Sequence, residues 1–406
     1  MMKALAASAA QTWFCAFGLA LSSVSAAERP EAEGVVSQNQ SRSITIGLLL
    51  PKDEAQAGSL QEGVVLAAAD ANRDPGLSVT AVIRGAFGQW GADGVEAARM
   101  VTDDQALGLI APPGGAGSHL ALQVAGRTAT PVISLCPDSS VTKTGVPWMV
   151  RITPSTVDEA RTLWTARGLA SQLASCWAVV VPPGRVGREI AHDMATAAEE
   201  AGLTSPTVIE AGDSSGNVDS LCRSAATAGK DSVLIWLDPV PAGHLVRALR
   251  DSGFRGPLAG SSRLNCAEFL EAAGAGAETF RVAGPALTSP DRARYELFTA
   301  AFQAKFGREP DATAAMSYDA AQLLISVIKR AGERPPHEVF PLLGEFPGVT
   351  GILRFDSDGN RKMALQVLEV QSGRFTASQP AEGPGFVPKE QQDDRHGLKS
   401  SRNDEK

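Results

Sequence analysis

The fold is decided by residues 44–72, which read ITIGLLLPKDEAQAGSLQEGVVLAAADAN. An apolar run, Ile44–Leu50, opens this stretch, and Pro51 ends it because proline cannot donate to a strand ladder. A polar loop follows from Lys52 to Ser59, and apolar residues then recur at helical spacing, at Leu60, Val64, Ala67 and Ala68. A short buried strand, a loop and an amphipathic helix form the first step of a βαβ unit. Since open α/β sheets bind ligands beyond the carboxyl ends of their strands, we expect the loop Lys52–Ser59 to form one wall of a site.

The same pattern returns in the second half of the chain. Cys176–Val181 is an apolar run, and Pro182-Pro183-Gly184 ends it. Gly202 is placed to cap the helix that follows, whose apolar face is formed by Ile190, Met194, Ala197 and Ala198. This weak internal repeat predicts an α/β protein with two lobes of like fold.

Length and composition indicate an ordinary globular protein. The chain has 406 residues, enough for two domains, with 44% hydrophobic and 20% charged residues. The formal net charge of −8 argues against nucleic acid as a partner. No Cys-x-x-Cys or His-x-x-x-His spacing suggests a metal site, and we expect neither a metal nor a cofactor.

Residues 1–27 have the pattern of a secretory signal peptide. A lysine precedes a short apolar segment, Trp13–Val24, and Ser25-Ala26-Ala27 supplies small residues for cleavage. The apolar segment is too short to span a membrane, and the alternative interpretation is an N-terminal core helix. A polar spacer, residues 28–42, follows the leader, and the charged residues 378–406 predict a disordered tail.

Four cysteines remain after this cleavage, at positions 136, 176, 222 and 266. An even number in an exported protein is compatible with disulfides, in three possible pairings. Cys176 begins a predicted strand and Cys222 lies on a predicted helix of the same lobe, so this pair is the favoured disulfide. We expect free thiols at Cys136 and Cys266, because these residues fall on loops of different lobes and a bridge would lock the lobes together.

Two loops in the first half follow predicted strands. The glycine-rich loop 111–119 follows the strand 107–110 and opens a helix over residues 120–127. Such a loop exposes backbone N–H groups at a helix N-terminus, where carboxylates bind, although tight turns alone also explain the glycines. The strand 131–135 ends in the polar loop 136–140, a second candidate wall.

The second half adds two more strand ends. The strand 232–237 ends at Asp238, and the strand 257–260 ends at Ser261-Ser262-Arg263. We expect residues 150–154 to cross between the lobes and residues 280–284 to return to the first.

Two further patterns concern packing and turns. Strands over 351–356 and 364–370 are separated by Asp358-Gly359-Asn360, which predicts a hairpin turn. The helical spacing of four aromatic residues predicts a core stripe rather than a cofactor site, at Tyr295, Phe298, Phe302 and Phe306.

In the order of its segments the chain resembles the type I periplasmic solute-binding proteins, specifically the leucine/isoleucine/valine-binding branch of branched-chain amino acid ABC transporters. The most specific match is FQAKFGREPDATAAMSYDAAQLLISVIKRAG, residues 302–332. Supporting matches are LGLIAPPGGAGSHLALQVAGRTATPVIS (107–134), VPWMVRITPS (146–155), AGHLVRALRDSGFRGPLAGS (242–261) and FPGVTGILRFDSDGN (346–360). Their number and order carry the resemblance, which covers about residues 44–375.

The resemblance implies a Venus-flytrap fold, in which two Rossmann-like lobes are joined by three hinge crossings and hold a ligand between them. Lobe 1 would comprise residues 43–153 and 284–342, and lobe 2 residues 154–283 and 343–377. The implied function is capture of a small polar solute in the periplasm, an amino acid or another carboxylate-bearing compound, and its delivery as a monomer to the permease subunits of an ABC importer in the inner membrane. Closure of the lobes signals capture, and no chemistry on the ligand is implied.

The resemblance also implies ligand contacts at loops that follow strands. In the first lobe they fall at Gly117, Ser118, His119, Cys136, Pro137 and Asp138. In the second lobe they fall at Arg185, Val186, Trp236, Asp238, Ser262 and Arg263. Ser118 with neighbouring N–H groups would hold a carboxylate, and Asp138 or Asp238 would hold an ammonium group.

The sequence departs from the amino-acid-binding pattern at two of these positions. An acidic residue of the second lobe is replaced by Ser262-Arg263, and an aromatic one by Arg185-Val186. The arginines favour an anionic ligand, and the alternative is that both are solvated residues of the rim.

Two other functions compete with transport. A sensor subunit would use the same fold to report its ligand to a membrane receptor. An enzyme would need a catalytic motif, and we expect none, because HExxH and nucleotide loops do not occur and Ser118-His119 are only sequence neighbours.

Overall fold

The computed structural model describes residues 41–50, 57–85, 91–166, 176–212 and 231–378. The predicted leader, most of the spacer and the tail lie outside the described residues, as do Cys222 and most of the loop Lys52–Ser59. The Cys176–Cys222 disulfide therefore stays a prediction. Cys266 is buried and carries a free thiol.

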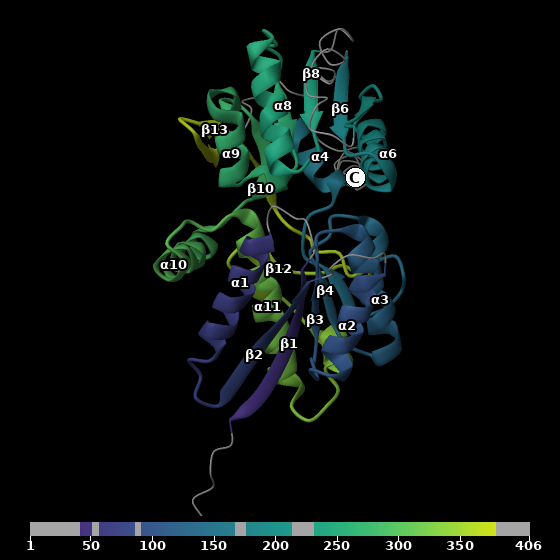
Figure 1. Ribbon diagram of the computed structural model, residues 1–406, viewed down its shortest axis with the longest axis vertical. Helices are drawn as coiled ribbons and strands as arrows, with labels where there is room; N and C mark the ends of the chain where they lie inside the picture. Colours follow the sequence, from purple (N-terminus) through teal and green to yellow (C-terminus); the bar gives the residue numbers. More distant parts are fainter. Residues whose placement is uncertain (1–40, 51–56, 86–90, 167–175, 213–230, 379–406) are drawn as a thin grey trace, which may run out of the picture. The chain divides into compact units, whose positions relative to one another are not determined.

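The first lobe is built on a five-stranded parallel sheet in the order β2-β1-β3-β4-β5 (Figure 1). Its strands are β1 (Arg42–Leu50), β2 (Leu77–Gly85), β3 (Leu109–Ala111), β4 (Val132–Ser134) and β5 (Met149–Arg151). This order places a topological switch between β1 and β3, where doubly wound sheets bind their ligands.

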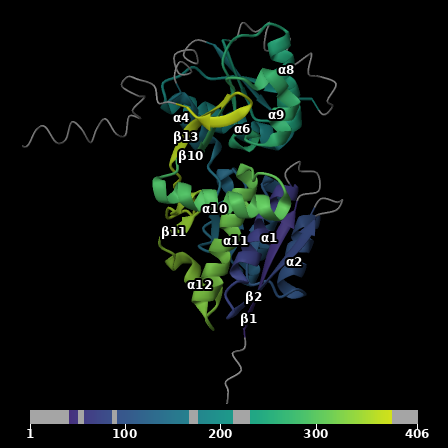
Figure 2. The same cartoon turned by 90° about the vertical axis from the view of Figure 1, so that its left-hand side faces the viewer.

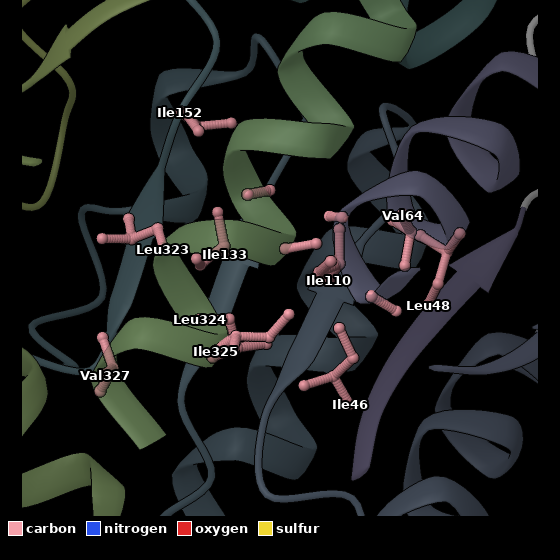
Figure 3. Packing of buried hydrophobic residues seen from close by; sticks show 14 of the residues in the cluster. Ile46, Leu48, Val64, Ile110, Ile133, Ile152, Leu323, Leu324, Ile325 and Val327 are labelled. Atoms are coloured by element: carbon pink, nitrogen blue, oxygen red, sulfur yellow. The ribbon is translucent and has the colours of Figure 1, made fainter. Parts of the chain in front are cut away.

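Helices cover both faces of this sheet because neighbouring residues of β1 point to opposite sides. Ile44, Ile46 and Leu48 pack with one pair of helices, α1 (Ala57–Ala71) and α11 (Ala312–Ala331). Leu49 packs on the other side with α2 (Ala92–Thr102) and α3 (Gly115–Thr128). Figure 3 shows the first of these cores, where aliphatic side chains of β1, β3 and β4 meet those of α11.

The second lobe is built on a seven-stranded sheet in the order β14-β13-β10-β9-β8-β6-β7. The five strands from β10 to β7 are parallel, and β13 and β14 add an antiparallel edge. The strands are β6 (Trp177–Val181), β7 (Thr207–Glu210), β8 (Ser232–Ile235), β9 (Leu258–Gly260), β10 (Arg281–Pro285), β13 (Leu365–Gln371) and β14 (Arg374–Ala377). Side chains of α8 (Pro239–Asp251) and α9 (Ala267–Ala273) pack in one core, and those of α4 (Thr156–Trp164) and α6 (Gly184–Glu200) in another. Two sheets of this kind confirm the predicted two-lobed α/β fold.

The chain passes between the two sheets three times, after β5, after β10 and before β13. The expectation that residues 280–284 return to the first lobe is wrong in detail. These residues belong to β10, which lies between β9 and β13 in the second sheet, and the crossing follows Pro285. An apolar run alone does not reveal which sheet a strand joins.

The segment 343–363 packs with the first lobe, although the predicted boundary gives it to the second. It contains a small antiparallel pair, β11 (Phe346–Gly348) and β12 (Gly351–Leu353). Leu353 is fully buried in the core that contains α11, and Val349 is buried beside α10 (Ser289–Phe306), seen in Figure 2. The short helix α12 (Pro336–Val339) precedes this segment.

The predicted turn at Asp358-Gly359-Asn360 is present, but it does not join the two strands that flank it in sequence. The N–H of Asp356 donates to the carbonyl of Asn360 at 2.9 Å. Strands β12 and β13 then go to different sheets. Gly359 has φ +84°, and a Cβ there would lie 2.6 Å from the carbonyl oxygen of Met149, so the turn fits closely against β5.

The aromatic stripe of α10 is a core element, as predicted. Phe298 and Phe302 are buried, and Tyr295 and Phe306 pack against them at the edge of the same cluster.

Candidate functional site

A cavity of about 510 Å³ lies where the strands of both sheets end. Loops after β3 and β4 contribute Gly114, Gly115 and residues 135–138 from the first lobe. Loops after β8 and β9 contribute residues 236–238 and 261–263 from the second. The volume lies in the range of small-molecule sites, and the position is the one that parallel α/β sheets use for ligands.

Much of the cavity wall is apolar. Side chains from α1, α6, α11, the third crossing and the start of β13 contribute to it, namely Leu60, Ile190, Met316, Met363 and Leu365. Trp236, at the end of β8, adds a large aromatic surface. The walls therefore suit a ligand with an apolar body.

Several helices begin at this cavity. Gly115 opens α3, Thr156 opens α4 and Ala312 opens α11, and residues at the beginnings of α6 and α8 also line it. The first N–H groups of a helix have no partner within the helix, and its N-terminus carries partial positive charge.

Nine of the twelve predicted contact residues line the cavity. They are Cys136, Pro137, Asp138, Arg185, Val186, Trp236, Asp238, Ser262 and Arg263. Their contact with a ligand stays a prediction.

The other three predicted residues, Gly117, Ser118 and His119, lie behind the wall. Ser118 has no exposed surface, and its hydroxyl donates to the carbonyl of Pro112 at 2.8 Å and lies 2.9 Å from the hydroxyl of Ser134. Within the loop it is Pro113, Gly114 and Gly115 that line the cavity. Small residues at a helix start do not tell which of them faces the ligand.

Asp138 presents one free carboxylate oxygen. Its Oδ1 accepts a hydrogen bond from the N–H of Ser140 at 2.8 Å, which caps the short helix η1 (Ser139–Val141). Its Oδ2 is buried and has no hydrogen-bond partner in the described part of the protein, and Nε2 of His119 lies 3.6 Å away. His119 in turn lies 3.0 Å from the hydroxyl of Ser140.

Both arginines of the cavity are paired with carboxylates of their own lobe. Arg185 contacts Glu189 at 2.5 Å, one turn later on α6, and its side chain is 68% exposed. Arg263 contacts Asp238 at 3.4 Å. These pairs fit the alternative of solvated rim residues, and they weaken the argument for an anionic ligand that rests on the arginines.

Glu159 is a cavity residue that the sequence analysis did not single out. It lies in the first turn of α4, is 3% exposed and faces Ser262, whose N–H donates to its Oε1 at 3.3 Å and whose hydroxyl donates to the same oxygen. Burial raises the pKa of Glu159 to about 7, and the hydrogen bonds from Ser262 oppose this shift. The missed signal is the capping box of Ser155 and Asp158, which starts α4 directly after the first crossing and turns Glu159 inward.

A second carboxyl group of the cavity also has a raised pKa. Burial and the charge of Asp138 raise the pKa of Asp193, on α6. Among the described residues, no group of three His, Cys, Asp or Glu side chains is placed to hold a metal ion.

Comparison with known proteins decides the family. Residues 43–374 match the family described as periplasmic binding protein. The chain belongs to this family. The match confirms the resemblance drawn from the sequence, and this family consists of solute-binding proteins. None of the helices that the structure describes is long and apolar enough to cross a membrane.

Solved structures share the fold at low sequence identity. A leucine-binding protein from Thermotoga maritima superimposes with a TM-score of 0.71 at 19% identity, covering 83% of this chain and 98% of that one. A branched-chain amino acid binding protein from Streptococcus pneumoniae, in complex with isoleucine, gives 0.71 at 20% identity, covering 84% and 99%. A solute-binding protein of an ABC transporter from R. palustris, in complex with benzoate, gives 0.73 at 17% identity, covering 86% and 99%. The sequence has no significant match among curated proteins.

Proposed function

We propose that this protein captures a small carboxylate-bearing solute between its two lobes and delivers it to the permease subunits of an ABC importer. It acts as a monomer in the periplasm, after its leader has been removed. Membership of the periplasmic binding protein family and the transporter neighbours support this function. The benzoate-binding and amino-acid-binding neighbours have ligands that share one group, a carboxylate.

The observation that carries the proposal is a set of uncapped helix starts at the cavity. The N-cap residues of α3, α6 and α8 are Gly114, Pro183 and Asp238, and none of them makes a side-chain capping hydrogen bond. By contrast, α4 and α11 are capped by Ser155 and Asp311. The starts of α3 and α6 thus bring uncapped N–H groups to one apolar space, and a ligand carboxylate would satisfy them. Helix α8 adds little, because Pro239 and Pro241 in its first turn have no N–H.

The apolar walls add a second requirement. A ligand that is only a small hydrated anion would leave Leu60, Ile190 and Met316 without contacts. A carboxylate attached to a branched aliphatic or aromatic body uses both features of the cavity.

A thermal-shift and calorimetry screen of residues 28–406 tests this function. Matched pairs differ only in the carboxylate: benzoate with benzamide, and 4-methylpentanoate with its amide, beside leucine, isoleucine and polyols. A ligand at one hundred times its Kd adds about 2.7 kcal/mol to the free energy of unfolding. We expect this shift from carboxylates and not from amides, and binding of amides or polyols alone would overturn the proposal.

A pair of variants locates the binding. Ile190→Trp places a bulky ring in the cavity and is expected to weaken binding at least about tenfold. Val95→Trp makes the same kind of change on α2, where Val95 is exposed and outside the cavity, and is expected to leave the Kd unchanged. Equal effects of the two changes would place the ligand elsewhere.

Delivery needs a cellular test. Loss of the gene is expected to abolish uptake of the solute that the purified protein binds. Normal uptake with a lost response to the solute would instead assign the protein to sensing.

A further inference from the structure

Each lobe brings one carboxyl group to the cavity with an oxygen that accepts no hydrogen bond from the described residues. In the first lobe, Asp138 uses Oδ1 to cap η1 and leaves Oδ2 without a hydrogen-bond partner among the described residues. In the second lobe, both hydrogen bonds that Glu159 receives within the described chain go to Oε1. The Oε2 atom of Glu159 therefore has no donor there, on a residue that is 3% exposed and lines the cavity. For Oδ2 of Asp138, which is buried, the missing partner is costly unless a ligand supplies one, whereas Oε2 of Glu159 keeps accessible surface and is open to a ligand in the cavity.

Among the described residues that line the cavity, no cation forms an ion pair with Glu159. Arg263, on the short helix η3 (Ser262–Leu264), is the cation that favours the ionised form of Glu159, but it pairs with Asp238. Arg185 pairs with Glu189. Of the described lining residues this leaves one lysine, Lys143, beside three carboxyl groups, those of Asp138, Glu159 and Asp193.

The charged side chains on α4 and on the elements packed against it are either ion-paired or acidic. On α4 itself, Asp158 disfavours ionisation of Glu159, and Arg161 pairs with Glu200 of α6. His192 and Asp193 face the cavity from α6. Strands β10 and β13 contribute an ion pair between Arg281 and Glu369, at 2.6 Å. Burial and these surroundings thus favour a protonated Glu159.

We propose that Glu159 makes solute capture proton-linked, because a protonated nitrogen group of the ligand binds opposite its carboxylate and the carboxyl gives up its proton to solvent when the ligand enters. This inference rests on the proposed function, since it concerns the same cavity, and it adds a second charged group to the ligand. The ligand nitrogen stays protonated, and one proton leaves the protein for each ligand bound below neutral pH. Ser262 is the positioning residue, because its two hydrogen bonds hold Oε1 and leave Oε2 to the ligand.

The direction in which ligand affinity changes with pH tells whether a nitrogen cation or a carboxylate of the ligand meets Glu159. If a nitrogen cation meets Glu159, the ligand must compete with the proton, so affinity rises with pH until the empty protein has lost that proton. If a ligand carboxylate meets Glu159, the protonated carboxyl donates a hydrogen bond to it, and affinity rises as the pH falls. With the pKa of Glu159 at about 7, the first arrangement predicts that Kd is about 100-fold higher at pH 5 than on its plateau at pH 8.

Three compounds with one carbon skeleton provide the test. Leucine carries both charged groups, 4-methylpentanoate lacks the amino group, and 3-methylbutylamine lacks the carboxylate. Calorimetry at pH 5, 6, 7 and 8, in phosphate and in Tris, gives Kd and the number of protons released. Leucine is expected to bind best, to tighten toward pH 8 and to release about one proton at pH 6.

Variants connect the effect to Glu159. Glu159→Gln keeps an acceptor for Ser262 and removes the titrating group, so the pH dependence is expected to disappear and leucine to bind at least about tenfold more weakly at pH 8. Ser262→Ala removes one hydrogen bond that favours the ionised carboxyl, and it is expected to move the midpoint of the pH profile upward. Glu200→Gln removes an exposed carboxylate that contacts α4 outside the cavity, and it is expected to keep the wild-type profile.

Three outcomes would overturn the inference. They are binding of 4-methylpentanoate as tight as that of leucine, affinity that increases toward pH 5, and no binding of any of the three compounds. In the first two cases carboxylate capture stands and only the proton-linked subsite is lost. In the third, the proposed function is judged separately by the carboxylates of the wider screen.

Discussion

The backbone N–H and the hydroxyl of Thr350 both donate hydrogen bonds to Oδ2 of Asp319, the N–H at 2.9 Å. Asp319 lies on α11 and is 1% exposed, and its Oδ1 accepts from the N–H of Val349 at 2.7 Å. Arg361 completes the cluster by donating to the hydroxyl and the carbonyl of Thr350, at 2.8 and 2.9 Å. One buried carboxylate thereby holds the turn between β11 and β12 on the helix that reaches the cavity.

This arrangement predicts a large stability effect at Asp319. Asp319→Ala leaves two buried N–H groups without their acceptor and removes the negative charge near Arg361. It is expected to lower the free energy of unfolding by about 3–5 kcal/mol. Asp319→Asn keeps one acceptor oxygen and is expected to cost clearly less. Urea unfolding at pH 7 measures both, and a loss below about 1 kcal/mol for the alanine variant would contradict this account.

The contact between α1 and α11 predicts a contrast between two glycines of one helix. A Cβ at Gly63 would lie 2.1 Å from the hydroxyl of Ser317 and 2.3 Å from the carbonyl oxygen of Ala314, so Gly63→Ala is expected to cost about 3 kcal/mol or more. A Cβ at Gly58 would meet nothing within 4 Å, and Gly58→Ala is expected to be neutral or to stabilise the helix by up to about 1 kcal/mol. Thermal melts of both variants give the comparison, and equal Tm values would show that the two helices can separate freely.

Glu159 predicts how stability changes with pH in the absence of ligand. Its pKa in the folded protein, about 7, lies above the ordinary value of 4.5, so between these values the folded state binds more protons than the unfolded state. The contribution of this group therefore falls as pH rises from about 4.5 to about 7, by about 3 kcal/mol. Glu159→Gln lacks this titrating carboxyl group, so the variant does not show this loss of stability.

The measurement is urea unfolding of the wild type and Glu159→Gln at pH 4.5 and pH 8. From pH 4.5 to pH 8, the free energy of unfolding of Glu159→Gln minus that of the wild type is expected to increase by about 3 kcal/mol. A difference that does not change with pH would show that the carboxyl titrates normally in the folded protein.

The sequence was sufficient for the lobes and for most loops of the cavity, because each candidate loop follows a buried apolar run. The stretch Ile44–Leu50 is β1 within Arg42–Leu50, and Cys136 to Asp138 line the cavity after β4. A strand followed by a polar loop is a local pattern, and parallel topology brings such loops to one edge.

What the sequence did not reveal depends on contacts between distant residues. Glu159 meets Ser262 only because α4 packs on the second sheet after the first crossing. In the sequence Arg185 and Arg263 favour an anionic ligand, whereas in the structure each contacts a carboxylate of its own lobe. The resemblance places the segment around Leu353 in the second lobe, whereas its buried side chains pack with α11.

Trp236 predicts an optical signal for capture. It lines the cavity and is 7% exposed, so a bound ligand replaces water beside the indole and is expected to change its emission. Trp236→Phe keeps an aromatic wall and is expected to remove this ligand-induced change, with less than a tenfold effect on the Kd measured by calorimetry. Trp148 serves as the matched control because its Nε1 donates to the carbonyl of Ala125 at 3.0 Å and it does not line the cavity. Trp148→Phe is expected to retain the signal, and its loss in this variant instead of Trp236→Phe would place the ligand outside the cavity.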